Sequence, residues 1–115
     1  MGADSMVVVY GLRYSLGLDG EVDDASLEPF ETKEDPRIRA ASRAGLETWF
    51  GKVADGGEYF LLVGTILGSF GAEGLERAQF TIDELGRVAT STQDGLRQAA
   101  LEGTPMLHVQ FQADY

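Results

Sequence analysis

The feature that most restricts the fold is an apolar run in the middle of the chain, Tyr59–Phe70. Its side chains are apolar at both odd and even positions, whereas a strand with one face in water alternates between apolar and polar residues. A strand that can be buried on both faces belongs inside a sheet rather than at its margin. A run of about 12 residues is too short to cross a membrane as a helix, which takes about 20. We therefore predict that this run is the central strand of a sheet.

Three further segments alternate between apolar and polar residues and are predicted to be strands with one buried face. They are Met6–Leu18, Glu76–Asp83 and Pro105–Tyr115. In the last of them the alternation places one set of side chains toward the core, namely Leu107, Val109, Phe111, Ala113 and Tyr115. The other set is expected to point outward, namely Met106, His108, Gln110, Gln112 and Asp114. Residues 1–5 precede the first predicted strand, and we expect them to form a disordered tail.

Two helices are predicted. The first covers Pro36–Ala54, because Asp35 is a good N-cap residue and proline suits the first helical position. Its apolar residues recur at three- and four-residue spacing, as on the buried face of a helix, at Ile38, Ala41, Gly45, Leu46, Trp49 and Val53. The second helix is predicted to start at the capping sequence Ser91–Asp94 and to end at Gly103.

The segment between the third predicted strand and the second helix has two interpretations. Asp83–Gly86 fits a type I turn, which would make Arg87–Thr90 a short return strand. The alternative is one long helix, since apolar or small residues also recur at helical spacing, at Leu85, Val88, Ala89, Thr92, Leu96 and Ala99. Two glycines, Gly86 and Gly95, and a cluster of β-branched residues weaken the long helix. We therefore prefer the hairpin and keep the helix as the alternative.

The order of predicted elements is strand, helix, strand, strand, helix, strand. It predicts a single α+β domain over residues 6–115, a two-layer sandwich with an antiparallel sheet and two helices on one face. Such a domain is ferredoxin-like (split βαβ) or a close relative. In that order the second strand lies at an edge, where its backbone invites pairing with another chain. Because the second strand here would be the apolar run, we expect either an added hairpin strand or a homodimer along that edge.

Composition excludes several classes of partner and chemistry. The chain has 19 acidic residues against 9 basic ones, a net charge of −10, which repels nucleic acid and anionic membranes. It has no cysteine and a single histidine, so thiolate and multi-histidine metal sites are excluded, and we expect no metal and no cofactor. The first residues lack a secretory pattern, so we expect a cytoplasmic protein. The residue bias, with no asparagine and two lysines, indicates a bacterial source of high GC content.

Much of the negative charge is concentrated in residues 19–35, which hold eight acidic residues and one lysine, a net charge of −7. The segment is predicted to be a solvated loop, and the alternative is an element that binds a basic partner through Asp23, Asp24 and Glu28. A calcium loop is excluded, because the position that requires glycine holds Asp24 and the closing acidic position holds Phe30.

The predicted helix that follows is basic, with Arg37, Arg39, Arg43 and Lys52 against Glu47. An acidic segment directly before a basic helix predicts that the acidic segment folds back over the arginines. The alternative is that the arginines bind an external anion.

Candidate site residues lie on the polar side of the predicted strands. We expect Arg13, Arg77, Gln79, His108 and Gln110 to share the sheet face that points away from the helices. His108 is either a sheet-face residue with no special role or a general base beside an arginine that positions an acidic substrate. The aromatic residues of these strands fall on the inward side, which argues against RNA binding by base stacking. A face of glutamine and arginine suits contact with a protein, including a second copy of the chain.

The leading functional hypothesis is therefore a small acidic protein of bacterial type that binds protein and has no enzymatic activity. It would be regulatory, with an inhibitor or immunity-type protein that caps a basic partner as one subtype. One alternative is a small enzyme or an anion- or ligand-binding domain that uses the arginine and histidine face. Another is a purely structural subunit of a larger assembly. The sequence contains no catalytic motif that decides among them.

Overall fold

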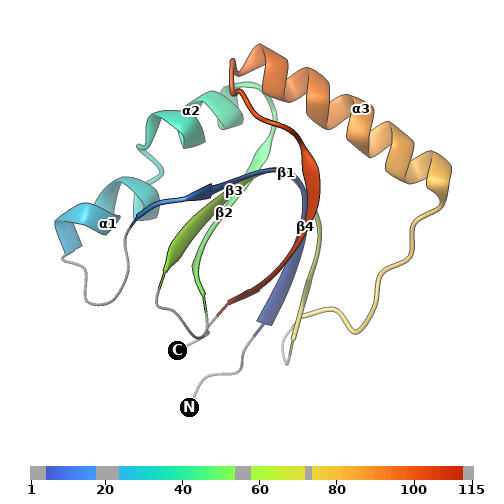
Figure 1. The fold of residues 1–115 in the computed structure, drawn as a ribbon, viewed down its shortest axis with the longest axis horizontal. Helices are drawn as coiled ribbons and strands as arrows, with labels where there is room; N and C mark the ends of the chain where they lie inside the picture. Colours follow the sequence, from blue (N-terminus) through green and yellow to red (C-terminus); the bar gives the residue numbers. More distant parts are fainter. Residues whose placement is uncertain (1–4, 18–23, 54–57, 72–73, 113–115) are drawn as a thin grey trace.

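The computed structural model describes residues 5–17, 24–53, 58–71 and 74–112. Within these ranges four strands and three helices follow one another: β1 (Ser5–Ser15), α1 (Asp24–Glu31), α2 (Pro36–Arg43), β2 (Glu47–Lys52), β3 (Tyr59–Phe70), α3 (Ile82–Gln98) and β4 (Met106–Gln112). The strands form one strongly curved antiparallel sheet, and the helices lie along its outer, convex side (Figure 1). The α+β class and the antiparallel sheet predicted from the sequence are therefore confirmed.

The apolar run forms β3, and its predicted interior position is confirmed. The strand order is β2-β3-β1-β4, so β3 is paired on both sides. Phe60, Leu61, Leu62 and Val63 are fully buried, although consecutive side chains point to opposite faces of the sheet. Both faces of the sheet therefore carry a core.

The core on the convex face lies between the sheet and the helices. Leu12 of β1 and two residues of β3, Leu61 and Val63, pack there against buried helix residues, namely Ile38, Ala41 and Leu96. Gly95 allows α3 to approach closely, because a methyl group at this position would meet Leu46 Cδ2 at 2.7 Å. A hydrogen bond of 2.7 Å between the Thr65 and Thr92 hydroxyl groups fixes α3 over β3.

The core on the concave face is covered by the curvature of the sheet itself. Val7 and Val9 of β1 pack there with Phe60 and Leu62 of β3. The two edge strands approach each other across this core, because Trp49 Nε1 in β2 donates a hydrogen bond of 2.7 Å to Gln112 Oε1 in β4. The Gln112 amide in turn donates to Ser5 Oγ at 3.0 Å. This face was predicted to be an open polar surface, and the structure shows instead that it is closed over an apolar cluster.

Helix α2 begins as predicted but ends earlier. The Asp35 carboxylate accepts a hydrogen bond from the Arg37 N–H, and Pro36 is the first helical residue. The prediction of a helix to Ala54 is wrong, because Gly45 has a left-handed φ of 78° and terminates it. The Gly45 N–H bonds to the Ser42 carbonyl and the Leu46 N–H to the Ala41 carbonyl, a Schellman arrangement that satisfies the last carbonyls.

The residues after Gly45 form β2, and this strand covers the edge of the apolar strand β3. Glu47–Lys52 pairs with Tyr59–Gly64 of β3 and occupies the sheet margin at which we expected the apolar run. The apolar strand is thus covered from within the chain, and the predicted dimerisation along its edge loses its basis.

The prediction for residues 76–90 is also wrong. Residues 76–81 are not a strand, and the hairpin that we preferred is absent from this part of the structure. Instead the alternative of one long helix holds, over Ile82–Gln98. The helix starts at a complete capping box, in which the Thr81 hydroxyl accepts from the Glu84 N–H and the Glu84 carboxylate accepts from the Thr81 N–H.

The acidic segment is partly helical rather than a loop. Residues 24–31 form α1, and Phe30 holds this helix to the sheet by stacking on Phe50 with ring centroids 5.1 Å apart. Asp24 and Glu28 are exposed on α1. Asp23 lies outside the described residues. Within the described ranges no acidic residue of α1 forms an ion pair with an α2 arginine, and the acidic segment meets these arginines through the ion pair of Asp35 with Arg37.

Apolar and polar side chains alternate along β4 as predicted. The prediction of which set is exposed to solvent is wrong. Leu107, Val109 and Phe111, predicted to face the core, are exposed. His108, Gln110 and Gln112, predicted to point outward, are half-buried at the concave face. The reason is the curvature of the sheet, which encloses the concave face, while the helices cover only part of the convex face.

Candidate functional site

The most distinctive surface of the protein is the convex face of β4. Directly opposed residues of antiparallel strands share a face, and β4 pairs Leu107 with Tyr10, Val109 with Val8 and Phe111 with Met6. These β1 residues alternate in phase with Leu12, which packs under the helices. We call Leu107, Val109 and Phe111, with Met6 and Val8 beside them, the apolar strip.

The apolar strip is open to solvent. The exposed fractions of Leu107, Val109 and Phe111 are 56%, 58% and 60%, and that of Met106 at the start of β4 is 55%. Helix α3 packs on β1 and β3, where the Gln93 amide donates a hydrogen bond of 2.8 Å to the Tyr10 hydroxyl. The helix layer therefore ends before it reaches β4. Contiguous exposed apolar surface is more common at sites of contact with other molecules than elsewhere on folded proteins.

A further apolar side chain lies next to this surface. Phe70 of β3 is paired with Met6, and Leu75 follows it, with its N–H bonded to the Ser69 carbonyl at 2.8 Å. A methyl group added at Gly68 would lie 3.5 Å from Leu75 Cδ1, so Leu75 covers the same face of β3. Leu75 is itself half-exposed, at 51%. The apolar surface thus continues from β4 across β1 to the end of β3.

Three of the residues predicted to form a binding face lie together on the concave side. The Arg13 Nε–H donates to Gln110 Oε1 at 2.8 Å, and the guanidinium carbon lies 5.3 Å from the centre of the Phe60 ring. The His108 Nε2 lies 3.0 Å from the Gly11 carbonyl oxygen. These contacts lie at the edge of the concave core. An open cavity of about 490 Å³ lies beside them. Its lining includes Arg13, His108, Glu102 and Met106.

The structure does not place the other two predicted residues on the sheet. Arg77 and Gln79 are exposed and belong to residues 76–81, which connect β3 to α3 without regular structure. The prediction assigned them to a strand that does not form. The arginine and histidine face therefore consists of Arg13, His108 and Gln110 alone.

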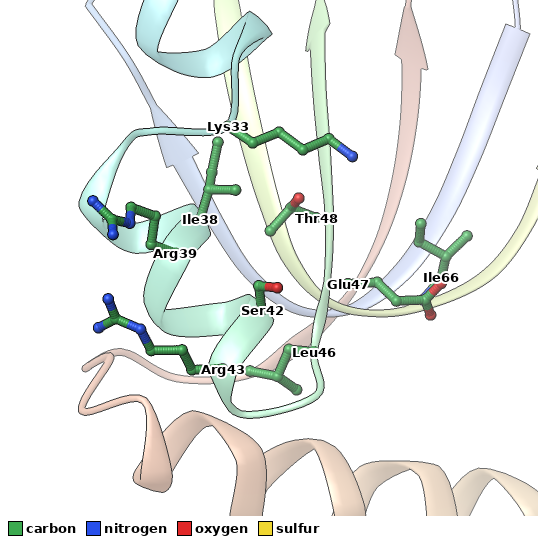
Figure 2. Close-up of a pocket in the computed structure, with 9 residues that line it drawn as sticks. All are labelled: Lys33, Ile38, Arg39, Ser42, Arg43, Leu46, Glu47, Thr48 and Ile66. Atoms are coloured by element: carbon green, nitrogen blue, oxygen red, sulfur yellow. The ribbon is translucent and has the colours of Figure 1, made fainter.

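A second open cavity, also about 490 Å³, lies between α2 and β2 and is lined by three cations, Lys33, Arg39 and Arg43. Figure 2 shows the two arginines extending from α2 to one side and the Lys33 side chain extending the opposite way, above Thr48. In the part of the chain that the structure describes, none of these three cations has an ion-pair partner. The one acidic residue of the lining, Glu47, accepts a hydrogen bond of 3.0 Å from the Ile66 N–H. The cavity could accept an anion.

The remaining arginine of this region has a structural role. The Arg37 Nε–H donates to Asp35 Oδ1 at 3.1 Å, and the guanidinium carbon lies 4.8 Å from the centre of the Tyr14 ring. Burial alone would raise the pKa of Asp35, but hydrogen bonds from Arg37 and the charge of that cation outweigh it and hold the pKa below its ordinary value. Burial raises the pKa of Tyr14, and the neighbouring Arg37 cation lowers it only in part.

Neither a metal centre nor a known relative indicates a function. Among the described side chains, no three histidine, aspartate or glutamate residues converge in a way that could hold a metal ion. No described helix has the length and apolar character of a membrane span. Comparisons with protein-family models, with curated proteins and with solved structures find no match to this chain.

The sequence prediction missed the apolar strip because it assigned those side chains to the core. One signal could have identified it. From Met106 to Gln112 the last strand has no acidic or basic residue except His108 and no proline, and the observed strand order puts it at a sheet edge. Edge strands normally carry such residues to prevent pairing with other chains. An uncharged edge strand with large apolar side chains therefore predicts a partner.

Proposed function

We propose that this protein is a small, non-enzymatic, protein-binding protein of regulatory type, and that it docks to protein partners, itself included, through the apolar strip of β4. The observation that carries the proposal is the exposure of Leu107, Val109 and Phe111, each more than half exposed on an uncharged edge strand. Large exposed apolar side chains cost solubility, and a folded protein keeps them side by side where a partner covers them.

The same proposal includes the finer fold assignment, a ferredoxin-like domain. The strand order β2-β3-β1-β4 supports it, as do the direct β2–β3 connection and the helical connections that lie on one face of the sheet. That fold is shared by proteins of many functions, so it carries no functional argument. The net charge of −10 supports partners that include neither nucleic acid nor anionic membranes. The lack of asparagine and the presence of only two lysines support a bacterial source.

The charge of α1 bears on the kind of partner. Asp24 and Glu28 are exposed and have no ion-pair partner among the described residues. A basic protein would be attracted to this helix, and such attraction raises association rates and selects the partner. An inhibitor or immunity-type protein that caps a basic partner is the corresponding subtype, in which α1 steers the encounter and the apolar strip supplies the contact area.

Affinity capture from the producing cell tests the proposal. Tagged wild-type protein and the variant Leu107→Ser/Phe111→Ser are compared, with partners and untagged copies of the chain quantified by mass spectrometry. We expect a partner recovered in near-stoichiometric amount by the wild type and reduced at least about tenfold by the variant. The matched control is Arg87→Ser/Gln98→Ser on the exposed side of α3, which should capture as the wild type does. Equal recovery by all three proteins would contradict docking through the strip.

A second variant, Asp24→Asn/Glu28→Gln, tests the part assigned to α1. Neutralising α1 should slow association with a basic partner and weaken its salt dependence, while leaving the dissociation rate nearly unchanged. If the variant associates at the wild-type rate at low salt, α1 is only a solvated helix, and the inhibitor subtype is to be dropped.

A second candidate function, anion or ligand binding, is favoured by the cationic cavity between α2 and β2. Three cations without described partners are unusual in a chain of net charge −10. Titration with inorganic phosphate, followed by NMR shifts, should then perturb the amides of residues 38–48. The variant Arg39→Gln/Arg43→Gln should abolish the response, and Arg87→Gln should not. Shifts centred on Arg13 and His108 would place the ligand in the other cavity, on the predicted sheet-face residues. No saturable shift at either cavity would exclude this function.

A further inference from the structure

We propose that the occupant of the apolar strip is a second copy of this chain, whose β4 pairs antiparallel with the first β4 about a twofold axis at Val109. The inference rests on the proposed function, since it uses the same surface, and it names both the partner and the register. It also moves the dimer contact from the β3 edge, which β2 occupies, to the opposite margin of the sheet.

The first argument is the state of the β4 edge. One side of β4 is paired with Ser5–Gly11 of β1, and no described strand pairs with its other side. An open row of backbone N–H and C=O groups recruits another strand unless charge, proline or a covering element prevents it. The opposite margin has such protection, because β2 carries Glu47 and Lys52. From Met106 to Gln112 β4 has no charge and no proline.

The second argument is that β4 complements itself. Antiparallel pairing about Val109 sets this residue opposite its own copy and Leu107 opposite Phe111 of the second copy. On the other face of the joined sheet it sets His108 opposite Gln110 and Met106 opposite Gln112. Apolar pairs thus occupy the convex face, and on the concave face the central pair, His108 with Gln110, joins two hydrogen-bonding side chains. A register shifted by one residue would set apolar residues opposite polar ones, so the side-chain pattern selects the faces.

The third argument is electrostatic. Two molecules of net charge −10 repel each other over most orientations. Like charges directly opposite each other also destabilise a strand pair. The β4 segment and the β1 residues beside it, Met6–Gly11, contain no aspartate, glutamate, lysine or arginine. This margin of the sheet is therefore a surface on which two copies meet without opposing carboxylates.

The size of the contact sets the expected affinity. A stable complex covers about 800 Å² on each partner, whereas one pair of seven-residue strands with the apolar strip falls below that. Interfaces below about 1,200 Å² in total are weak and transient. We therefore expect an exchanging dimer with a dissociation constant of about 1–100 μM rather than a permanent one.

The test combines sedimentation equilibrium with cysteine crosslinking. The chain has no cysteine, so single substitutions report one contact each. Opposed residues of antiparallel strands have Cβ atoms about 4.5–5.5 Å apart, so Val109→Cys should form an intermolecular disulfide readily. Leu107→Cys alone should not, because its two copies would lie about 13 Å apart along the strands. A mixture of Leu107→Cys and Phe111→Cys should give the mixed disulfide. Thr90→Cys, exposed on α3, measures random collision.

Each outcome has a defined meaning. We expect the wild type to pass from 12.4 kDa to twice that mass between about 1 μM and about 1 mM. We expect Val109→Lys, which sets two cations opposite each other, to stay monomeric with an unchanged circular dichroism spectrum. A wild type that dimerises while Val109→Cys crosslinks no faster than Thr90→Cys overturns the register and the β4 contact. A wild type that is monomeric at about 1 mM overturns self-association altogether. In that case, loss of the captured partner by Leu107→Ser/Phe111→Ser would still support docking of another protein at the strip.

Discussion

The substitution Leu62→Ala examines whether the sheet is closed on its concave face. Leu62 has no exposed surface, although none of the described helices covers its side of the sheet, and it packs with Val7, Val9 and Phe60. If the concave face were open, this side chain would lie in water and its truncation would change stability little. If the curvature of the sheet encloses it, truncation leaves a cavity in a packed core.

The magnitude follows from the atoms removed. Leucine to alanine deletes three carbons from the side chain, about 2.4 kcal/mol of transfer free energy at about 0.8 kcal/mol per group. The cavity that remains adds to this value, and measured substitutions of this type cost about 2–5 kcal/mol. Domains of this size have unfolding free energies of about 5–15 kcal/mol. We therefore expect Leu62→Ala to remove a large fraction of the stability, and Leu61→Ala, under the helices, to cost a similar amount.

Urea unfolding followed by circular dichroism measures the effect, at a protein concentration low enough to keep the chain monomeric. The denaturation midpoint should fall and the slope of the free energy against urea should stay the same, because the unfolded surface is unchanged. The control is Ile82→Ala, since Ile82 is 81% exposed at the start of α3 and should change the free energy by less than about 0.5 kcal/mol. A Leu62→Ala variant as stable as this control would refute the closed concave core.

Three other substitutions test individual parts of the fold. Because the pKa of Asp35 is lowered in the folded state, its carboxylate stabilises the protein fully above about pH 5, and this contribution is lost as the pH falls through about 4 and below. Asp35→Asn should therefore lower the free energy of unfolding at pH 7 and make it depend less on pH in the acid range. An unchanged pH dependence would show that the pair with Arg37 contributes nothing. Gln112→Ala should cost about 1–2 kcal/mol, because the indole N–H of Trp49 loses its acceptor. It should also shift the fluorescence of Trp49 to the red, because water takes the place of the Gln112 side chain beside the indole. An unshifted spectrum would contradict the contact between the edge strands. Ala100→Gly should stabilise the protein by about 1 kcal/mol, because Ala100 has a left-handed φ of 56° that glycine adopts without steric penalty. The gain should appear as a rise in Tm of about 4–8 °C. An unchanged or lower Tm would indicate that the backbone at Ala100 is not strained.

The sequence was sufficient to predict the elements that have strong local signals. The apolar run at Tyr59–Phe70 identified β3 and its interior position, because a strand that is apolar on both faces is buried inside a sheet. The Asp35-Pro36 pair identified the start of α2, because an N-cap followed by proline satisfies the first turn of a helix. Alternation identified β1 and β4 to within a few residues at each end.

The errors arose where a competing signal was weighted too little. Leu46, Trp49 and Val53 continue the helical spacing of α2, but Gly45 adopts the left-handed conformation that ends a helix, and β2 follows. Gly95 was counted against a long α3, whereas it permits the close approach of this helix to Leu46. The decisive start signal of α3, the pair of Thr81 and Glu84, was present in the sequence but was assigned to a strand and a turn.

The candidate site was less predictable than the fold. Alternation separates the two faces of β4 but does not say which face is closed, since that depends on how far the sheet curves. The contact between Trp49 and Gln112, 63 residues apart, decides it. Of the five residues predicted to share a face, Arg13, His108 and Gln110 lie together, but these side chains border a closed core. The exposed residues are those predicted to be buried.

Amide hydrogen exchange of β4 tests the central claim, pairing of this strand with another chain, most directly. In a lone antiparallel edge strand, alternate amides bond to the neighbouring strand and the others face solvent. We predict that the solvent-facing amides within Leu107–Phe111 exchange fast at about 1 μM and become protected at about 1 mM, while the protection of α3 amides stays constant. Rapid exchange of those β4 amides at every concentration, with or without a captured partner present, would contradict the claim.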